Sequence, residues 1–106
     1  MNVKMSDELL NLYTFSKSKE YKDVERNPEL LNGFMRAVRS MIMAKNVQEL
    51  QAISYLHYEK LKYEYSDYSS VRLSNRYVHR LLFTETEDGI EVELIEIDDR
   101  HYGNKK

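Results

Sequence analysis

Cysteine is absent from this chain, and so is tryptophan. Without cysteine there is no disulfide framework and no zinc site built on thiolates. A single proline and three glycines among 106 residues leave no Pro- or Gly-rich linker that could separate two domains. We therefore expect one domain with one modest core over residues 1–106.

Long hydrophobic runs are also missing. No apolar segment approaches the roughly 20 residues that a membrane-spanning helix needs. The first residues, "MNVKMSDELL", lack a basic region followed by an apolar one, so we expect no signal peptide. Hydrophobic residues make up 42% and charged residues 32%, which is typical of a soluble globular domain. We expect a cytoplasmic protein with no membrane partner.

Neither sign of charge dominates, since 16 basic and 18 acidic residues give a net charge of -2. Nucleic-acid-binding domains are usually basic overall, so any contact with RNA or DNA has to come from a local patch. The three histidines are His57, His79 and His101, and their scattered positions show no metal-ligand spacing. We expect neither a metal site nor a cofactor.

The first half of the chain has the signals of helices. Ser6, followed by two acidic residues, is typical of a helix start. The segment "NPE" (27–29) is a stronger start and predicts the longest helix over about 28–45. The segment "NVQE" (46–49) resembles a capping box for a short helix. Apolar residues recur at helical spacing and predict the buried stripe Leu31, Phe34, Val38, Met41 and Ile42.

The second half has the signals of strands. Residues 68–74, 78–86 and 90–97 are rich in β-branched and aromatic side chains, and "EDG" (87–89) is typical of a hairpin turn. Helices followed by strands predict an α+β domain, with the N-terminal helices packed on one face of a small antiparallel sheet. We expect a core that contains Leu31, Phe34, Val38, Leu81, Phe83 and Ile95.

Counting residues from the turns predicts which side chains share a face. If "NRY" (75–77) is a three-residue turn, Arg72 lies opposite Arg80, and if "EDG" is likewise the turn, Arg80 lies opposite Glu96. The more apolar face should then pack on the helices. It would hold Val71, Leu73, His79, Leu81, Phe83, Ile95 and Ile97. The other face would hold Ser70, Arg72, Arg80, Leu82, Val92, Leu94 and Glu96.

Two arginines opposite each other are mildly destabilising unless something negative lies between them. One interpretation is that Glu96 neutralises Arg80 while Arg72 reaches solvent. The other is that an anion such as an RNA phosphate binds between the arginines. The spacing alone favours the first interpretation.

A series of segments in a fixed order resembles the RelE/HigB-type toxins of bacterial type II toxin–antitoxin modules, in the RelE/ParE superfamily. The N-terminal "LYTFSKSKEYK" is similar to a HigB-like branch of these proteins. The segments, in chain order, are "LHYEKLK" (56–62), "YSSVRLSN" (68–75), "HRLLF" (79–83), "IEVELIEI" (90–97) and "HYG" (101–103).

The resemblance implies a cytoplasmic endoribonuclease that cuts mRNA on the translating ribosome without a metal or cofactor. It also implies a cognate antitoxin, expected to be a small helix-turn-helix protein. In the implied reaction the ribose 2′-OH attacks the adjacent phosphate. That chemistry needs a base for the 2′-OH, cations for the developing charge and an acid for the leaving 5′-oxygen.

Position by position, the resemblance also implies residue roles. Glu59 matches a general base, and Arg72 and Arg80 match two sheet arginines that stabilise the phosphate. His101 and Tyr102 match a C-terminal pair, one for proton transfer and one for orienting the base or nucleotide. The positions expected to bind RNA are Lys60, Lys62 and Arg76.

Two other functions stay open. A ParE-like toxin that inhibits DNA gyrase keeps the sheet but lacks the acid/base set, and the presence of Glu59, His101 and Tyr102 together argues against it. A decayed copy that only binds its antitoxin would have the same fold. Toxicity on expression distinguishes the two active toxins from a decayed copy. Stalled translation would then indicate the endoribonuclease, and stalled replication the gyrase inhibitor.

Overall fold

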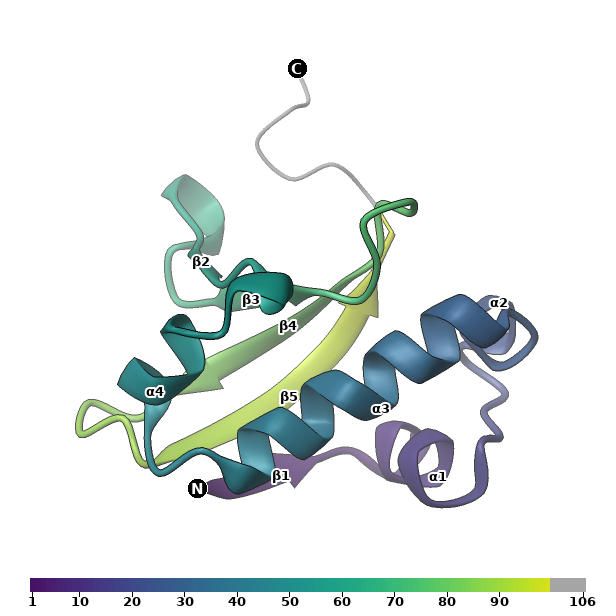
Figure 1. The fold of residues 1–106 in the computed structure, drawn as a ribbon, viewed down its shortest axis with the longest axis horizontal. Helices are drawn as coiled ribbons and strands as arrows, with labels where there is room; N and C mark the ends of the chain where they lie inside the picture. Colours follow the sequence, from purple (N-terminus) through teal and green to yellow (C-terminus); the bar gives the residue numbers. More distant parts are fainter. Residues whose placement is uncertain (100–106) are drawn as a thin grey trace.

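A five-stranded mixed sheet is the scaffold of the protein, and the computed structural model describes it within residues 1–99 (Figure 1). The strand order is β1-β5-β4-β3-β2, in which β1 runs parallel to β5 and every other neighbouring pair is antiparallel. The strands are β1 (Asn2–Met5), β2 (Glu59–Lys60), β3 (Ser69–Arg72), β4 (Arg80–Glu85) and β5 (Glu91–Asp98).

Helices cover one face of this sheet, and the longest of them, α3, crosses that face (Figure 1). The α+β class is therefore confirmed. None of the helices within residues 1–99 is both long and apolar enough to cross a lipid bilayer. The helices are α1 (Asp7–Phe15), α2 (Lys22–Glu25), α3 (Pro28–Met43) and α4 (Val47–Gln51), with 3-10 turns at Ser54–Leu56 and Tyr63–Tyr65.

The starts of α1, α3 and α4 lie where the sequence predicts them, because each of these three helices has a side chain that caps it. Ser6 Oγ accepts a hydrogen bond from an amide of α1 at 3.4 Å, and Asn27 Oδ1 accepts two from the first turn of α3 at 3.0 and 3.2 Å. Asn46 Oδ1 accepts from the amide of Glu49 at 2.9 Å. The Glu49 carboxylate accepts a hydrogen bond from the amide of Lys45 at 2.8 Å. In a standard capping box this bond comes from the amide of the N-cap residue, here Asn46, so the predicted box forms with its second bond moved by one residue.

The core lies between α3 and the sheet. The predicted stripe is correct at Phe34, Val38 and Met41, which are fully buried. It is wrong at its edges, since Leu31 is only partly buried and Ile42 is 45% exposed. The buried line of α3 lies to one side of the predicted one and consists of Leu30, Gly33, Phe34, Ala37, Val38 and Met41.

The three predicted strands are confirmed as antiparallel neighbours, but the expectation of a purely antiparallel sheet is wrong. β1 adds a parallel edge beside β5, with Asn2 opposite Glu91. β2 adds the other edge, with Glu59 opposite Ser70. Both edges are short, and a strand of two to four residues leaves too little alternation to be recognised in the sequence.

The predicted register is correct for one hairpin and wrong for the other. Arg72 lies opposite Arg80 as expected. Arg80, however, lies opposite Asp98 rather than Glu96. One residue of the difference comes from the loop, because the amide of Thr86 already pairs with the carbonyl of Glu91 at 3.0 Å. The other comes from a β-bulge, because Leu82 pairs with Glu96 while the next residue, Phe83, pairs with Leu94.

This register changes the faces of β5, since a shift of one residue moves every side chain to the other side of the sheet. Val92 and Leu94 are buried in the core instead of lying beside the arginines. Ile95 is the extra residue of the bulge and is only partly buried, so its predicted place in the core is wrong. The bulge adds a second shift of one residue, so the residues of β5 after it lie on the faces that the sequence predicts. Ile97 is therefore in the core.

α3 approaches the end of β3 very closely at Gly33. A Cβ atom built on Gly33 would lie 1.8 Å from the backbone carbonyl oxygen of Leu73. Real Cβ atoms do not come so near to backbone atoms, so any side chain here would push α3 away from the sheet. Glycine at this position therefore sets the distance between the two layers.

We expect Gly33→Ala to lower the free energy of unfolding by about 1–3 kcal/mol, as overpacking does in well-packed cores. The direction is informative because alanine is otherwise the better helix former by about 0.8–1.0 kcal/mol. Urea denaturation of both proteins measures the change. Asn32→Ala, at the exposed neighbouring position of the same helix, is the control and should be neutral or slightly stabilising. A Gly33→Ala protein as stable as the wild type would contradict this contact.

Candidate functional site

Two arginines face each other on the side of the sheet that is turned away from α3. Val71 and Leu81 point into the core, so Arg72 and Arg80, each next in its strand, point to the opposite face. Directly opposed residues on one face have Cβ atoms about 4.5–5.5 Å apart. Arg72 is exposed, whereas the side chain of Arg80 is only 20% exposed. The pair concentrates positive charge where the protein as a whole has a slight negative excess.

Glu59 joins this pair from the edge strand β2. Its carboxylate oxygen Oε1 accepts a hydrogen bond from Arg80 Nη1 at 3.1 Å, and its side chain is 55% exposed. The expectation that Glu96 is the cross-strand neighbour that neutralises Arg80 is wrong, because the bulge in β5 moves Glu96 opposite Leu82. Within residues 1–99 no carboxylate forms an ion pair with Arg72.

A hydrogen-bond cluster on the other face of the sheet holds β2 in place. The Tyr58 hydroxyl and the Ser69 hydroxyl each donate to Glu85 Oε2 at 2.6 Å, and the two hydroxyl oxygens are 3.1 Å apart. The Tyr58 ring also packs on Phe83, with ring centroids 6.1 Å apart. Since β2 has only two residues in the ladder, this anchoring of Tyr58 fixes the neighbouring Glu59.

The environment of Tyr58 keeps its hydroxyl protonated. Burial raises the pKa of Tyr58 above its usual range, and the hydrogen bond to the Glu85 carboxylate raises the pKa further. Tyr58 is therefore a hydrogen-bond donor over the whole ordinary pH range, as the cluster requires.

The remaining basic residues of the expected site lie in different surroundings. Lys60 and Lys62 are exposed. Lys60 lies opposite Ser69 and directly follows Glu59 in β2, so the side chains of Glu59 and Lys60 point to opposite faces of the sheet. Arg76 Nη1 donates to Glu29 Oε1 at 3.1 Å, which ties Arg76 to the first turn of α3. Two further residues assigned from the sequence, His101 and Tyr102, lie outside the described residues.

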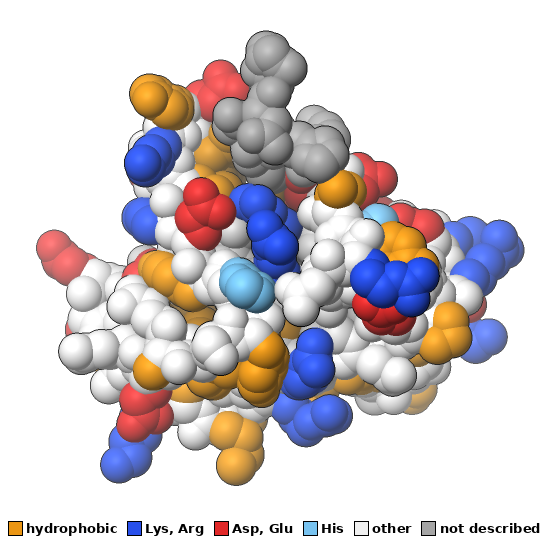
Figure 2. All heavy atoms as spheres, turned by 45° about the horizontal axis from the view of Figure 1, so that its top comes forward, with side chains coloured by type: hydrophobic (Ala, Val, Ile, Leu, Met, Phe, Trp, Pro, Cys, Tyr) orange, Lys and Arg blue, Asp and Glu red, His pale blue; other side chains and the backbone are white. Residues whose placement is uncertain are grey.

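His57 is a histidine to which the sequence assigns no role. It is exposed, directly follows the turn Ser54–Leu56 and has a φ of 50°. A left-handed backbone is uncommon in residues other than glycine, and such positions are enriched at functional sites. His57 lies only two residues before Glu59. Figure 2 shows basic, acidic and histidine side chains gathered near the middle of one face of the protein.

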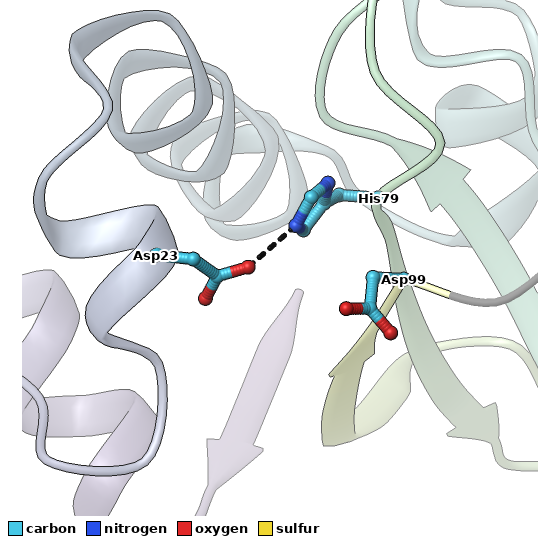
Figure 3. A group of neighbouring side chains, drawn as sticks. All are labelled: Asp23, His79 and Asp99. Atoms are coloured by element: carbon cyan, nitrogen blue, oxygen red, sulfur yellow. Dashed lines mark hydrogen bonds and ion pairs between the residues drawn. The ribbon is translucent and has the colours of Figure 1, made fainter.

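A second cluster joins Asp23, His79 and Asp99 (Figure 3). His79 Nε2 forms a hydrogen bond with Asp23 Oδ2 at 2.7 Å, and the possible ligand atoms of the three residues lie within 4.8 Å of one another. The His79 side chain is 13% exposed, in line with the packed position that its strand pattern indicates. The cluster connects α2 to the ends of β4 and β5. These three side chains could together hold a metal ion; the expectation of no metal site stays a prediction.

The fold is similar to that of solved bacterial toxins. It matches a chain of the heterotetrameric YoeB–YefM toxin–antitoxin complex from Staphylococcus aureus with a TM-score of 0.54 and 18% identity, over 96% of this chain and 98% of that chain. It matches the YoeB/ParE toxin from Agrobacterium tumefaciens with a TM-score of 0.53 and 14% identity, over 95% of this chain and 100% of that chain. No family model and no curated protein sequence matches the chain.

These matches cover nearly the whole length of each protein, so the likeness is one of complete folds rather than of a shared fragment. The chain therefore has the fold of YoeB/ParE-type toxins. The resemblance that the ordered sequence segments carry is confirmed at the level of the fold.

We expect Tyr58→Phe to lower the free energy of unfolding by about 1–3 kcal/mol, because a hydrogen bond to a charged acceptor is lost. The pH dependence gives a second readout. Because the pKa of Tyr58 is raised in the folded state, its contribution to stability is fully present below about pH 10, the ordinary tyrosine pKa, and is lost as the pH rises from there through the higher pKa of the folded state. This alkaline loss should be smaller in Tyr58→Phe.

Thermal denaturation between pH 7 and pH 11 measures both effects. Tyr63→Phe is the matched control, because the Tyr63 side chain is 88% exposed and should contribute neither effect. If Tyr58→Phe is as stable as the wild type, the hydrogen-bond cluster does not anchor β2.

Proposed function

We propose that the chain is the toxin of a type II toxin–antitoxin module and acts in the cytoplasm as a metal-independent endoribonuclease on mRNA at the ribosome. The observation that carries the proposal is the pair Arg72 and Arg80 with Glu59 bound to Arg80. A phosphodiester needs cations at its non-bridging oxygens and a base near its ribose hydroxyl. The three side chains supply both kinds of group on one face of the sheet.

The proposed reaction begins when RNA displaces Glu59 from Arg80. An ion pair this exposed is worth only about 0–1 kcal/mol, so a phosphate can replace the carboxylate at small cost. The freed carboxylate of Glu59 then takes the proton of the ribose 2′-OH. The 2′-oxygen forms a bond to phosphorus, the bond to the 5′-oxygen breaks, and a 2′,3′-cyclic phosphate results.

The other residues have supporting roles in this proposal. Arg72 and Arg80 bind the negative charge that grows on the phosphate, and His101 gives a proton to the leaving 5′-oxygen. Tyr102 orients the base or nucleotide, as a hydrogen-bond donor or stacking surface. The residues proposed to hold the RNA backbone are Lys60, Lys62 and Arg76.

The proposal includes a protein partner that silences the toxin. The similar chain from S. aureus belongs to a complex of a toxin with its antitoxin. By analogy, we propose a cognate antitoxin for this chain, a small helix-turn-helix protein.

Loss of a charged side chain at the site should slow cleavage strongly. We expect Arg80→Ala to reduce the rate about 10²–10³-fold, as for removal of one electrostatic stabiliser of a transition state. Glu59→Gln and His101→Ala should each reduce it about 10²–10⁴-fold. Single-turnover cleavage of an mRNA on purified ribosomes measures these rates. Lys4→Ala, on the distant edge strand β1, is the control and should cleave like the wild type.

The ends of the products test the chemistry. Attack by the internal 2′-OH leaves a 2′,3′-cyclic phosphate or a 3′-phosphate, which mass spectrometry of the fragments identifies. Products with a 3′-hydroxyl would mean that water attacked, and the roles of Glu59 and His101 would then be wrong. If expression stalls DNA replication and leaves mRNA intact, the gyrase-inhibiting alternative replaces this proposal.

A further inference from the structure

A groove with a volume of about 680 Å³ lies between the C-terminal half of α3 and α4. Apolar side chains form much of its lining, among them Ile53 and two that stand well out of the surface: Met43 is 80% exposed and Tyr55 is 45% exposed. Exposed apolar surface of this kind, bordered by polar residues, marks an interaction site. The groove belongs to the helical side of the protein, whereas Arg72 and Arg80 point away from that side.

The border of this groove is positively charged. Arg36 and Arg39 line it from successive turns of α3, and within residues 1–99 neither forms an ion pair. Among the lining residues within positions 1–99, the only carboxylate is that of Glu49, which already accepts a hydrogen bond from the backbone amide of Lys45. The two guanidinium groups therefore lack a carboxylate from the described chain.

Part of this border is already ordered in the free protein. The guanidinium carbon of Arg36 lies 4.7 Å from the centroid of the Tyr55 ring, and the Tyr55 hydroxyl is 3.0 Å from Ser40 Oγ. Side chains that are held before binding lose less conformational entropy on binding. Arg36 and Tyr55 thus form a fixed wall beside the apolar floor.

We propose that this groove binds an acidic amphipathic helix of a partner protein. Apolar residues at i, i+3, i+4 and i+7 of that helix occupy the groove, and its carboxylates pair with Arg36 and Arg39. The identification of the partner with the antitoxin rests on the proposed function. An aliphatic floor offers nothing to a phosphate backbone, so the occupant is a peptide rather than RNA. Binding here leaves the arginine pair on the other face accessible.

The test uses a fluorescein-labelled synthetic helical peptide of about 14 residues, with leucines at the apolar spacing and glutamates beside them. Fluorescence anisotropy at low salt should show saturable binding to the wild-type protein. A peptide with lysine in place of each glutamate should bind at least about tenfold more weakly, because like charges then face each other.

Variants of the protein locate the binding site. The double variant Arg36→Glu/Arg39→Glu should bind the acidic peptide at least about tenfold more weakly than the wild type, and Met43→Gln should weaken this binding by a smaller factor. Lys17→Glu with Lys19→Glu makes the same change in net charge elsewhere and should bind like the wild type. All of these positions are exposed, so the variants should fold, which circular dichroism checks.

Three results would overturn the proposal. They are equal binding of the acidic and basic peptides, unchanged binding by the Arg36→Glu/Arg39→Glu protein, and displacement of the peptide by an RNA oligonucleotide. Sedimentation that shows a wild-type dimer lost in that double variant would make a second copy of the chain the occupant instead. The double variant should still cleave mRNA at the wild-type rate. If the wild type does not cleave mRNA but peptide binding follows the expected pattern, the proposed function is wrong and the proposal of a helix-binding groove is still supported.

Discussion

Alternation of side chains across the sheet is the constraint on which both faces of this protein depend. Each central strand has to place apolar residues under α3 and, one position later, polar residues on the opposite face. In β5 this works only because the four-residue loop after Thr86 and the bulge at Ile95 each shift the pairing by one residue. Together the two shifts keep Val92, Leu94 and Ile97 in the core while Glu96 remains on the arginine face.

The electrostatics of the site depend on a strand that is almost too short to form. β2 brings the Glu59 carboxylate to Arg80 in the free protein. The partly buried hydrogen bonds of Tyr58 and Ser69 with Glu85 supply the rigidity that two ladder residues cannot. In our proposal, a weak exposed ion pair supported by a stronger, less exposed network suits the replacement of the carboxylate by an incoming phosphate.

The protein separates its two charged surfaces by the thickness of the fold. In our proposals, the sheet face with Arg72 and Arg80 binds RNA, while the groove beside Arg36 and Arg39 binds a partner helix. A chain with a net charge of -2 can have both surfaces because charge acts locally, within about a Debye length of 10 Å at ordinary salt. Such an arrangement lets a partner be held without contact to the proposed reacting groups.

The sequence by itself determined the features that depend on near neighbours. Asn27 and Ser6 fix the helix starts because a cap bonds to amides only two or three residues away, and the short β3–β4 connection sets Arg72 opposite Arg80. Only the tertiary structure decided the features that join distant segments. The pairing of β1 with β5, the bond of Glu59 to Arg80 and the bond of Asp23 to His79 all span many residues. Such contacts follow from how the whole core packs, and a single bulge in one strand changes which residues meet.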